Sequence, residues 1–317
     1  MSQVMNVIRA ETFKVLRKRR LYVLAVLFWV LLPVLALIVA RVLFANLSGS
    51  FANEAGTIDQ ALQAFASPIG LARLALTGPA YTSPTLYIVA VTLIAALLIG
   101  DERSQNMWKT VLVLQPSRWA VMTGKVVVAL GALAVLMAGA GVSGFLFGAL
   151  GTTFLPTEFG GDWLPLVGLY ALQAAQLLAP VLLAFLFITL VRSGVLGVVM
   201  VLFLPSLLEA IYAVINTISQ LQPLNRINAL FQALHLQQVW QALPKYFFTA
   251  NLYAPGRRPA GTWLGQVVGQ GDLSDLGPLN SMLGTGLSLG HSALVMAGYS
   301  VLFGVILYWW FLRRDVD

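Results

Sequence analysis

Few side chains in this sequence could do chemistry. The chain has no cysteine and only two histidines, His235 and His291, so thiolate catalysis, disulfides and cysteine-held metals are excluded. It contains no Gly-x-x-x-x-Gly-Lys-Ser/Thr segment to cradle phosphates, no His-Glu-x-x-His and no Gly-x-Ser-x-Gly. The sequence therefore predicts no catalytic residue, no metal site and no ATP-binding loop in this chain.

Three polar side chains interrupt apolar runs and are candidates for a substrate pathway. Glu209 is one, and a charge near the centre of a membrane helix costs roughly 3 kcal/mol, so such an acid usually faces a cavity or a partner. The alternative places Glu209 near the outer membrane interface, neutral or paired with Arg41. Gln173 and Gln176, one helical turn apart, either line a pathway or join helices by hydrogen bonds.

Six long apolar stretches must position these residues. The 317 residues are 59% hydrophobic and only 10% charged, whereas a soluble domain carries about 25% charged residues. About 20 apolar residues span a bilayer as a helix, and uninterrupted apolar runs do not fit barrel strands. We expect an all-α integral membrane protein with six transmembrane helices, in one domain covering residues 1–317. The predicted spans are 21–44, 84–100, 119–147, 164–191, 195–218 and 292–312.

The lysines and arginines predict the orientation of these spans. Six of them lie in residues 1–20, four lie in or just after the loop 101–118, and Arg313 and Arg314 follow the last span. The shorter segments on the other side hold only Arg73, and the long segment 219–291 holds four such residues but is too long for them to count strongly. Because positive residues favour the cytoplasmic side, both termini are predicted to be cytoplasmic. The net charge of +7 follows from this topology, and no nucleic-acid partner is expected.

A long external segment, residues 219–291, precedes the last span. Its first part repeats apolar residues near helical spacing, which predicts an external amphipathic helix before the sixth span. Residues 251–279 are rich in glycine and proline and are predicted to form a loop. The apolar residues of the predicted helix are Ile227, Leu230, Phe231, Leu234, Val239, Trp240 and Leu243.

The sequence of the loop 101–118, which the predicted topology places in the cytoplasm, predicts a short helix with one apolar face. Its apolar residues recur at i, i+1, i+4 and i+5, and Pro116 prevents the helix from continuing. Such a face either docks in a groove on a partner or lies on the membrane interface with Trp108 as an anchor. The apolar residues are Met107, Trp108, Val111 and Leu112.

The order of these features resembles a known family. A basic N-terminal segment leads into the first span, the second span ends at Glu102, and a short helix follows. Leu-Gln-Pro-Ser-Arg at 114–118 and then Lys125 come next. This pattern resembles the permease subunit of the type 2 ABC exporters, which include bacterial bacitracin, lantibiotic and sodium exporters.

The resemblance implies a function. Residues 107–114 would be a coupling helix that docks on an ABC ATPase subunit, and residues before Arg17 would form an elbow helix on the inner leaflet. A second permease chain, as a homodimer, would complete the substrate pathway by alternating access. This chain would have no cofactor, with ATP and Mg²⁺ on the ATPase, in the cytoplasmic membrane of a prokaryote. The implied docking residues are Glu102, Met107, Trp108, Val111, Leu112, Pro116 and Arg118.

The residues alone leave two other classes of function to weigh: an ATP-independent carrier or channel, and a membrane enzyme working on lipids, which would need a nucleophile or metal set that the chain lacks. An ATP-independent carrier or channel would need its own ion-coupling groups, for which Glu209 with Arg41 is the only candidate. The basic N-terminal segment has a second interpretation too, as a solvated arm attracted to anionic lipid.

Overall fold

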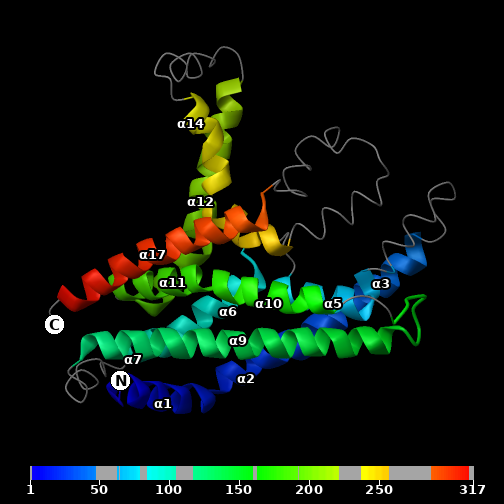
Figure 1. Ribbon diagram of the computed structural model, residues 1–317, viewed down its shortest axis with the longest axis horizontal. Helices are drawn as coiled ribbons and strands as arrows, with labels where there is room; N and C mark the ends of the chain where they lie inside the picture. Colours follow the sequence, from blue (N-terminus) through cyan, green and yellow to red (C-terminus); the bar gives the residue numbers. More distant parts are fainter. Residues whose placement is uncertain are drawn as a thin grey trace.

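A computed structural model gives the structure of the protein. It describes residues 2–47, 63, 65–78, 84–104, 117–159, 163–191, 193–220, 237–256 and 287–313. Within these ranges every regular element is a helix (Figure 1). The all-α prediction is confirmed for this part of the chain.

Five helical segments are long and apolar enough to cross a membrane. They coincide with five of the six predicted spans: the first, third, fourth, fifth and sixth. A multi-pass membrane protein follows from their length and composition. The segments are Arg19–Val42, Arg118–Gly151, Leu164–Val191, Gly194–Ile218 and Leu289–Arg313.

The second predicted span is helical but short. It consists of α6 (Leu86–Ala95), the π-helical turn η2 (Ala96–Gly100) and α7 (Asp101–Ser104), and its apolar part ends at Gly100. Another apolar helix, α5 (Pro68–Thr77), precedes it. Nearly all of α6 is buried among other helices, so it does not need the length of a lipid-facing span. The total of six spans stays a prediction.

The N-terminal segment is a helix of its own. Helix α1 (Ser2–Leu16) ends before Lys18, whose extended backbone separates it from α2 (Arg19–Val26). Val7 and Val15 of α1 are buried, and a Cβ at Gly124 of α9 would lie 2.5 Å from Val7 Cγ1. The segment before Arg17 is therefore a packed helix, as an elbow requires, and the solvated-arm interpretation is wrong.

Helix α9 (Arg118–Gly151) is the longest helix of the described structure and carries glycines where α5 crosses it. A Cβ at Gly144 would lie 2.7 Å from the Leu71 carbonyl oxygen. At Gly148 a Cβ would lie 2.5 Å from Pro68 Cα. Only glycine permits this close approach of the two backbones.

Helix α11 (Leu178–Val191), which follows α10 (Leu164–Gln176), is surrounded by other helices. Helices α6, α12 (Gly194–Gln220) and α17 (Leu289–Arg313) all contact α11. The distal part of α12 stands away from the other helices, with α14 (Gln237–Ala242) alongside it (Figure 1). Much of the apolar surface of α12 is consequently exposed.

The predicted external segment is helical in its described part. Helix α14 is followed by the 3₁₀ turn η3 (Leu243–Tyr246) and by helical residues 248–256. The loop predicted from residue 251 is thus wrong for 251–256, because these residues pack against other helices and Leu252 and Tyr253 are buried. Residues 221–236, with most of the predicted amphipathic helix, lie outside the described residues.

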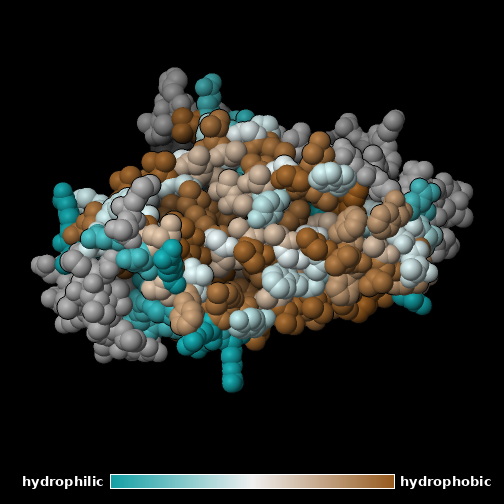
Figure 2. Space-filling view, turned by 60° about the horizontal axis from the view of Figure 1, so that its bottom comes forward, coloured by the Kyte–Doolittle hydropathy of each residue, from teal (hydrophilic) through white to brown (hydrophobic). Residues whose placement is uncertain are grey.

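The start of α1 and the end of α17 lie at the same end of the molecule (Figure 1). Hydrophilic side chains gather mainly at this end of the face shown in Figure 2, while apolar side chains cover its middle. This arrangement agrees with both termini on one side of a membrane. That this side is the cytoplasm stays a prediction.

Candidate functional site

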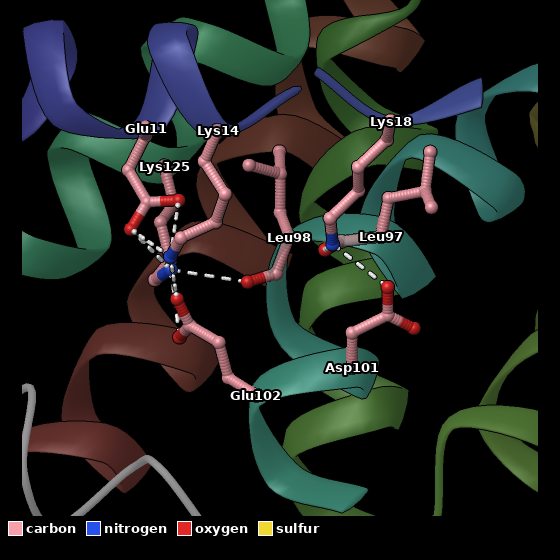
Figure 3. A network of polar contacts seen from close by, with 8 residues as sticks. All are labelled: Glu11, Lys14, Lys18, Leu97, Leu98, Asp101, Glu102 and Lys125. Atoms are coloured by element: carbon pink, nitrogen blue, oxygen red, sulfur yellow. Dashed lines mark hydrogen bonds and ion pairs between the residues drawn. The ribbon is translucent and has the colours of Figure 1, made fainter. Parts of the chain in front are cut away.

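Four charged side chains from three helices meet where the predicted coupling loop leaves the bundle (Figure 3). The Lys125 ammonium of α9 lies 2.7 Å from Glu11 Oε1 and 2.8 Å from Glu102 Oε2. Lys14 donates to Glu102 and lies 3.3 Å from Glu11 Oε1. We refer to Glu11, Lys14, Glu102 and Lys125 as the charged cluster, and its two positive and two negative charges balance.

Three of the four side chains of the charged cluster are buried. The exposed fraction of the side chain is 0% for Lys125, 6% for Glu11 and 4% for Glu102. A buried charge left without its partner typically costs 3–5 kcal/mol of stability, by the order of magnitude seen when such pairs are broken. The cluster therefore holds α1, α7 and α9 in one arrangement, because none of the buried charges tolerates the loss of its partner.

The surroundings shift the pKa values of two members of the charged cluster, Glu102 and Lys14. Burial favours the neutral form of Glu102, but the ammonium groups of Lys125 and Lys14 outweigh it and lower the pKa of Glu102 below its usual value. Burial likewise opposes the charge of Lys14, yet the carboxylates of Glu102 and Glu11 raise its pKa above the usual value. Both shifts favour the charged forms that the ion pairs require.

Two backbone carbonyl groups of the π-helical turn η2 accept hydrogen bonds from Lys18 and Lys125. In this wide turn the Asp101 N–H bonds to the Ala96 carbonyl, five residues back. The Leu97 carbonyl accepts a hydrogen bond from Lys18 Nζ at 2.6 Å, and the Leu98 carbonyl accepts one from Lys125 Nζ at 3.0 Å. Single π turns of this kind are frequent at functional sites.

Two other contacts fix the same end of the helix. Lys18 Nζ lies 2.7 Å from Asp101 Oδ2, so α7 also binds the residue between α1 and α2. On the opposite side Gly100 faces Gly194 at the start of α12, and a Cβ on either glycine would lie 3.3 Å from the other's Cα. The last turn of the second predicted span is thus held by α1, α9 and α12 together.

The predicted docking residues divide into two groups. Glu102 is described, and its buried carboxylate binds Lys125 and Lys14 of the same chain. Arg118 is also described: it begins α9, and its Nη1 donates to the Leu312 carbonyl at 3.4 Å. The apolar face of the predicted coupling helix lies outside the described residues, namely Met107, Trp108, Val111, Leu112 and Pro116.

Glu209 lies far from the charged cluster, in the distal half of α12. Its Oε1 accepts a hydrogen bond from the Thr249 backbone N–H at 2.8 Å, and its Oε2 accepts one from the Thr249 hydroxyl. Because Thr249 lies in the first turn of helix 248–256, the carboxylate also meets the positive end of the helix dipole. Arg41, proposed as its partner, has its guanidinium over the Phe154 ring.

Gln173 and Gln176 are buried in α10. The Oε1 atom of Gln173 and both polar side-chain atoms of Gln176 have no hydrogen-bond partner within the described ranges. A cavity of about 10 Å³ adjoins Gln173, Thr77 and Thr85, which is room for about one water molecule. Gln173 is thus buried next to a small space, and Gln176 is buried one helical turn further along α10.

The sequence interpretation missed most of the charged cluster. Its signal is visible in retrospect: Glu11 shares the face of Val7 and Val15, and Lys125 stands within an apolar run. Two opposite charges on apolar faces predict a buried pair. No group of three His, Asp or Glu side chains suited to a metal occurs among the residues that the structure describes.

The long apolar helices and the packed N-terminal helix define a multi-pass membrane protein. The chain belongs to the ABC-2 family of transporter proteins, whose family model matches residues 7–208. The match includes α1 from residue 7 onward, the charged cluster and the loop 101–118, and it confirms the resemblance to type 2 ABC permeases. The comparisons with curated proteins and with solved structures found no match.

The family makes this chain a membrane component of an ABC transporter. Association with an ABC ATPase subunit follows from that membership.

Proposed function

We propose that the chain is the membrane-spanning subunit of an ATP-driven ABC exporter, which receives motion through the loop 101–118. The observation that carries this proposal is the position of the Glu102–Lys125 ion pair within the family match. Glu102 lies at the start of the loop, and Lys125 lies two turns into the helix that follows it. The pair therefore ties together the two ends of the proposed coupling loop.

A displacement of the loop would move several helices at once. Because Glu102 and Lys125 are buried and paired, α7 and the start of α9 shift together when the loop is pushed. Lys125 also binds Glu11, so α1 follows. The Gly100–Gly194 contact passes the same displacement to α12. Alternating access requires this kind of joint movement of packed elements.

ATP hydrolysis takes place on the ATPase subunit, with its Mg²⁺, because this chain has no phosphate-cradling loop. The ATPase would contact the apolar face formed by Met107, Trp108, Val111 and Leu112, flanked by Pro116 and Arg118. Glu102 acts differently from a surface contact: its carboxylate is buried, so it would position the loop from within.

A second copy of this chain would complete the pathway. Val199, Phe203, Leu207 and Ile211 recur every four residues on α12 and are all exposed. They form one apolar stripe on the helix that stands away from the others (Figure 1). A homodimer would cover this stripe by a symmetric contact.

The substrate pathway would pass the buried glutamines and Glu209 in the outward half of the bundle. The unpartnered polar atoms of Gln173 and Gln176 would gain partners from substrate or water when the helices part. Apolar spans favour a peptide antibiotic, drug or lipid over a small ion. The protein would work in the cytoplasmic membrane of a prokaryote.

The test is reconstitution of the permease with the P-loop ATPase encoded beside its gene. We expect the tagged permease to retain the ATPase in detergent, and export from cells to require both subunits and an intact phosphate-binding lysine in the ATPase. Export that continues with the ATPase inactivated would overturn the proposal in favour of an ATP-independent carrier.

A further inference from the structure

An apolar groove of about 450 Å³ runs between α1, the first spanning helix and α9. Its volume lies in the range of about 300–1,000 Å³ typical of ligand sites. Its lining consists of aliphatic side chains and Gly131, together with Thr12, Tyr22 and Trp29. Such a lining has few hydrogen-bonding groups and therefore suits a hydrocarbon chain.

The length of the groove matches one membrane leaflet. Its α9 side extends from Val127 to Leu136, nine residue steps or about 14 Å of helix. The hydrocarbon core is about 30 Å thick, so this is about half of it. At the end of the groove near Leu136, Trp29 Nε1 donates a hydrogen bond to the Leu136 carbonyl at 2.9 Å. The other end lies at the junction of α1 and α2, where the Tyr22 hydroxyl donates to the Leu16 carbonyl at 2.8 Å.

Positive charge surrounds the end at the junction. Arg9 of α1, Arg17 between the two helices, and Arg19 and Arg20 at the start of α2 are all exposed, and of these Arg20 also lies 3.4 Å from Asp101 Oδ1. Glu11 is the one acid in residues 1–26, and it is buried against Lys125. Each such basic residue near an anionic membrane surface contributes about 1 kcal/mol of attraction. The charge therefore favours an anionic headgroup over a zwitterionic one.

We propose that this groove binds one acyl chain of an anionic phospholipid from the inner leaflet, with the lipid phosphate beside the arginines at the α1–α2 junction. The lipid fastens the N-terminal helix to the first span and to α9, on the face of α1 next to the charged cluster. This inference uses the predicted orientation of the chain and does not depend on ATP-driven transport.

Gly131 allows a direct test. It lines the groove, and a Cβ built on it meets no atom within 4 Å. Gly131→Leu therefore places a side chain in the groove, and its Cβ meets no clash with the described residues. Gly298 of α17 has the same open surroundings outside the groove, so Gly298→Leu is the matched control. Val135→Phe, at an exposed lining residue, is a second filling variant in case the first does not fold.

The measurement is native mass spectrometry of delipidated permease titrated with phosphatidylglycerol or phosphatidylcholine. We expect the unaltered chain and Gly298→Leu to bind phosphatidylglycerol more strongly than phosphatidylcholine. Gly131→Leu and Val135→Phe displace two or three methylene groups and should weaken phosphatidylglycerol binding on the order of tenfold. Equal binding by filled and unfilled chains, or equal binding of the two lipids, would overturn the proposal.

ATPase association of the same variants separates this inference from the proposed function. Gly131→Leu leaves the loop 101–118 and the charged cluster unaltered, so the ATPase should still co-purify. Loss of the lipid with full ATPase association supports the groove as a lipid site and leaves the coupling proposal intact.

Discussion

Lys125 of α9 and Glu11 of α1 form an ion pair with 2.7 Å between Nζ and Oε1, although 114 positions separate them in the sequence. The lysine is fully buried, so this contact exists only when the N-terminal helix is seated on α9. The same ammonium group binds Glu102, at the start of the proposed coupling loop. The N-terminal helix and the loop are therefore linked through a single side chain.

Loss of the Lys125 charge should destabilise the permease. Lys125→Met leaves two buried carboxylates against one lysine, which should cost about 3–5 kcal/mol and lower the melting temperature of the purified permease. Adding Glu11→Gln restores the charge balance and should recover part of the loss. Lys245→Met, at an exposed lysine, serves as the control and should change stability by less than about 0.5 kcal/mol. Equal melting temperatures for Lys125→Met and this control would show that the cluster does not hold the helices together.

The charged cluster should be insensitive to pH around neutrality. The lowered pKa of Glu102 means that its stabilising contribution is complete above its unfolded pKa of about 4.3 and is lost as the pH falls through the lower folded value. The raised pKa of Lys14 means the reverse: its contribution is complete below about pH 10.4 and is lost as the pH rises through the folded value.

The measurement is the difference in melting temperature between the permease and its Glu102→Gln variant over a range of pH. We expect a constant difference from about pH 6 to 9 and a smaller one at the acid extreme, below about pH 4. A difference that disappears between pH 6 and 8 would mean that Glu102 is protonated there and that the ion pairs are absent.

Glu209 should anchor helix 248–256 to α12. Its carboxylate accepts both the N–H and the hydroxyl of Thr249, and a hydrogen bond to a charged group contributes about 1.5–3 kcal/mol. Glu209→Ala should therefore speed amide hydrogen exchange in residues 250–256, and Glu209→Gln, which keeps one acceptor oxygen, should speed it less. Unchanged exchange together with altered transport would instead assign Glu209 to the substrate pathway.

The topology can be tested by labelling, because the native chain has no cysteine. A single cysteine at Ser104, at the end of α7, should react with an impermeant thiol reagent only after the cells are permeabilised. A cysteine at Glu158, an exposed residue between the third and fourth predicted spans, should react on intact cells. Reaction of both from outside would contradict the predicted orientation.

The long spans could be predicted because they depend on local patterns of apolar residues, whereas the sequence left the N-terminal segment open between a packed elbow helix and a solvated arm. Five spans and the family followed from run length and from residues 101–125. The predicted span 84–100 corresponds to the apolar helix Leu86–Gly100, which is short for a span and nearly all buried in its α6 part. The helix 248–256 differs from the loop predicted from residue 251 because contacts distant in the sequence support it: Leu252 and Tyr253 are buried against other helices, and Glu209, forty positions before Thr249, binds its first turn.

The pairing of charges in the charged cluster could not be predicted from the sequence. Glu102 was selected as a surface contact, and its carboxylate is instead buried against Lys125 and Lys14. Which charges pair depends on how α1 crosses α9, and no spacing within either helix specifies that crossing. A lysine in an apolar run was the available signal, and it indicates a buried partner without naming it.

The central claim is that the loop 101–118 couples this permease to an ATPase. Trp108→Ala with Leu112→Ala removes the largest groups of the proposed docking face. Large aromatic anchors at an interface commonly contribute about 2 kcal/mol or more, on the order of thirtyfold in affinity. Trp119→Ala is the matched control, since Trp119 is an exposed tryptophan at the start of α9, just beyond the loop.

The most direct measurement is the amount of ATPase that co-purifies with tagged permease in nanodiscs, normalised to inserted permease, together with export. The double variant should lose most of the bound ATPase, or should hydrolyse ATP without export, while Trp119→Ala keeps both. Full ATPase binding and full export by the double variant would contradict the account, because the loop would then not be the coupling element.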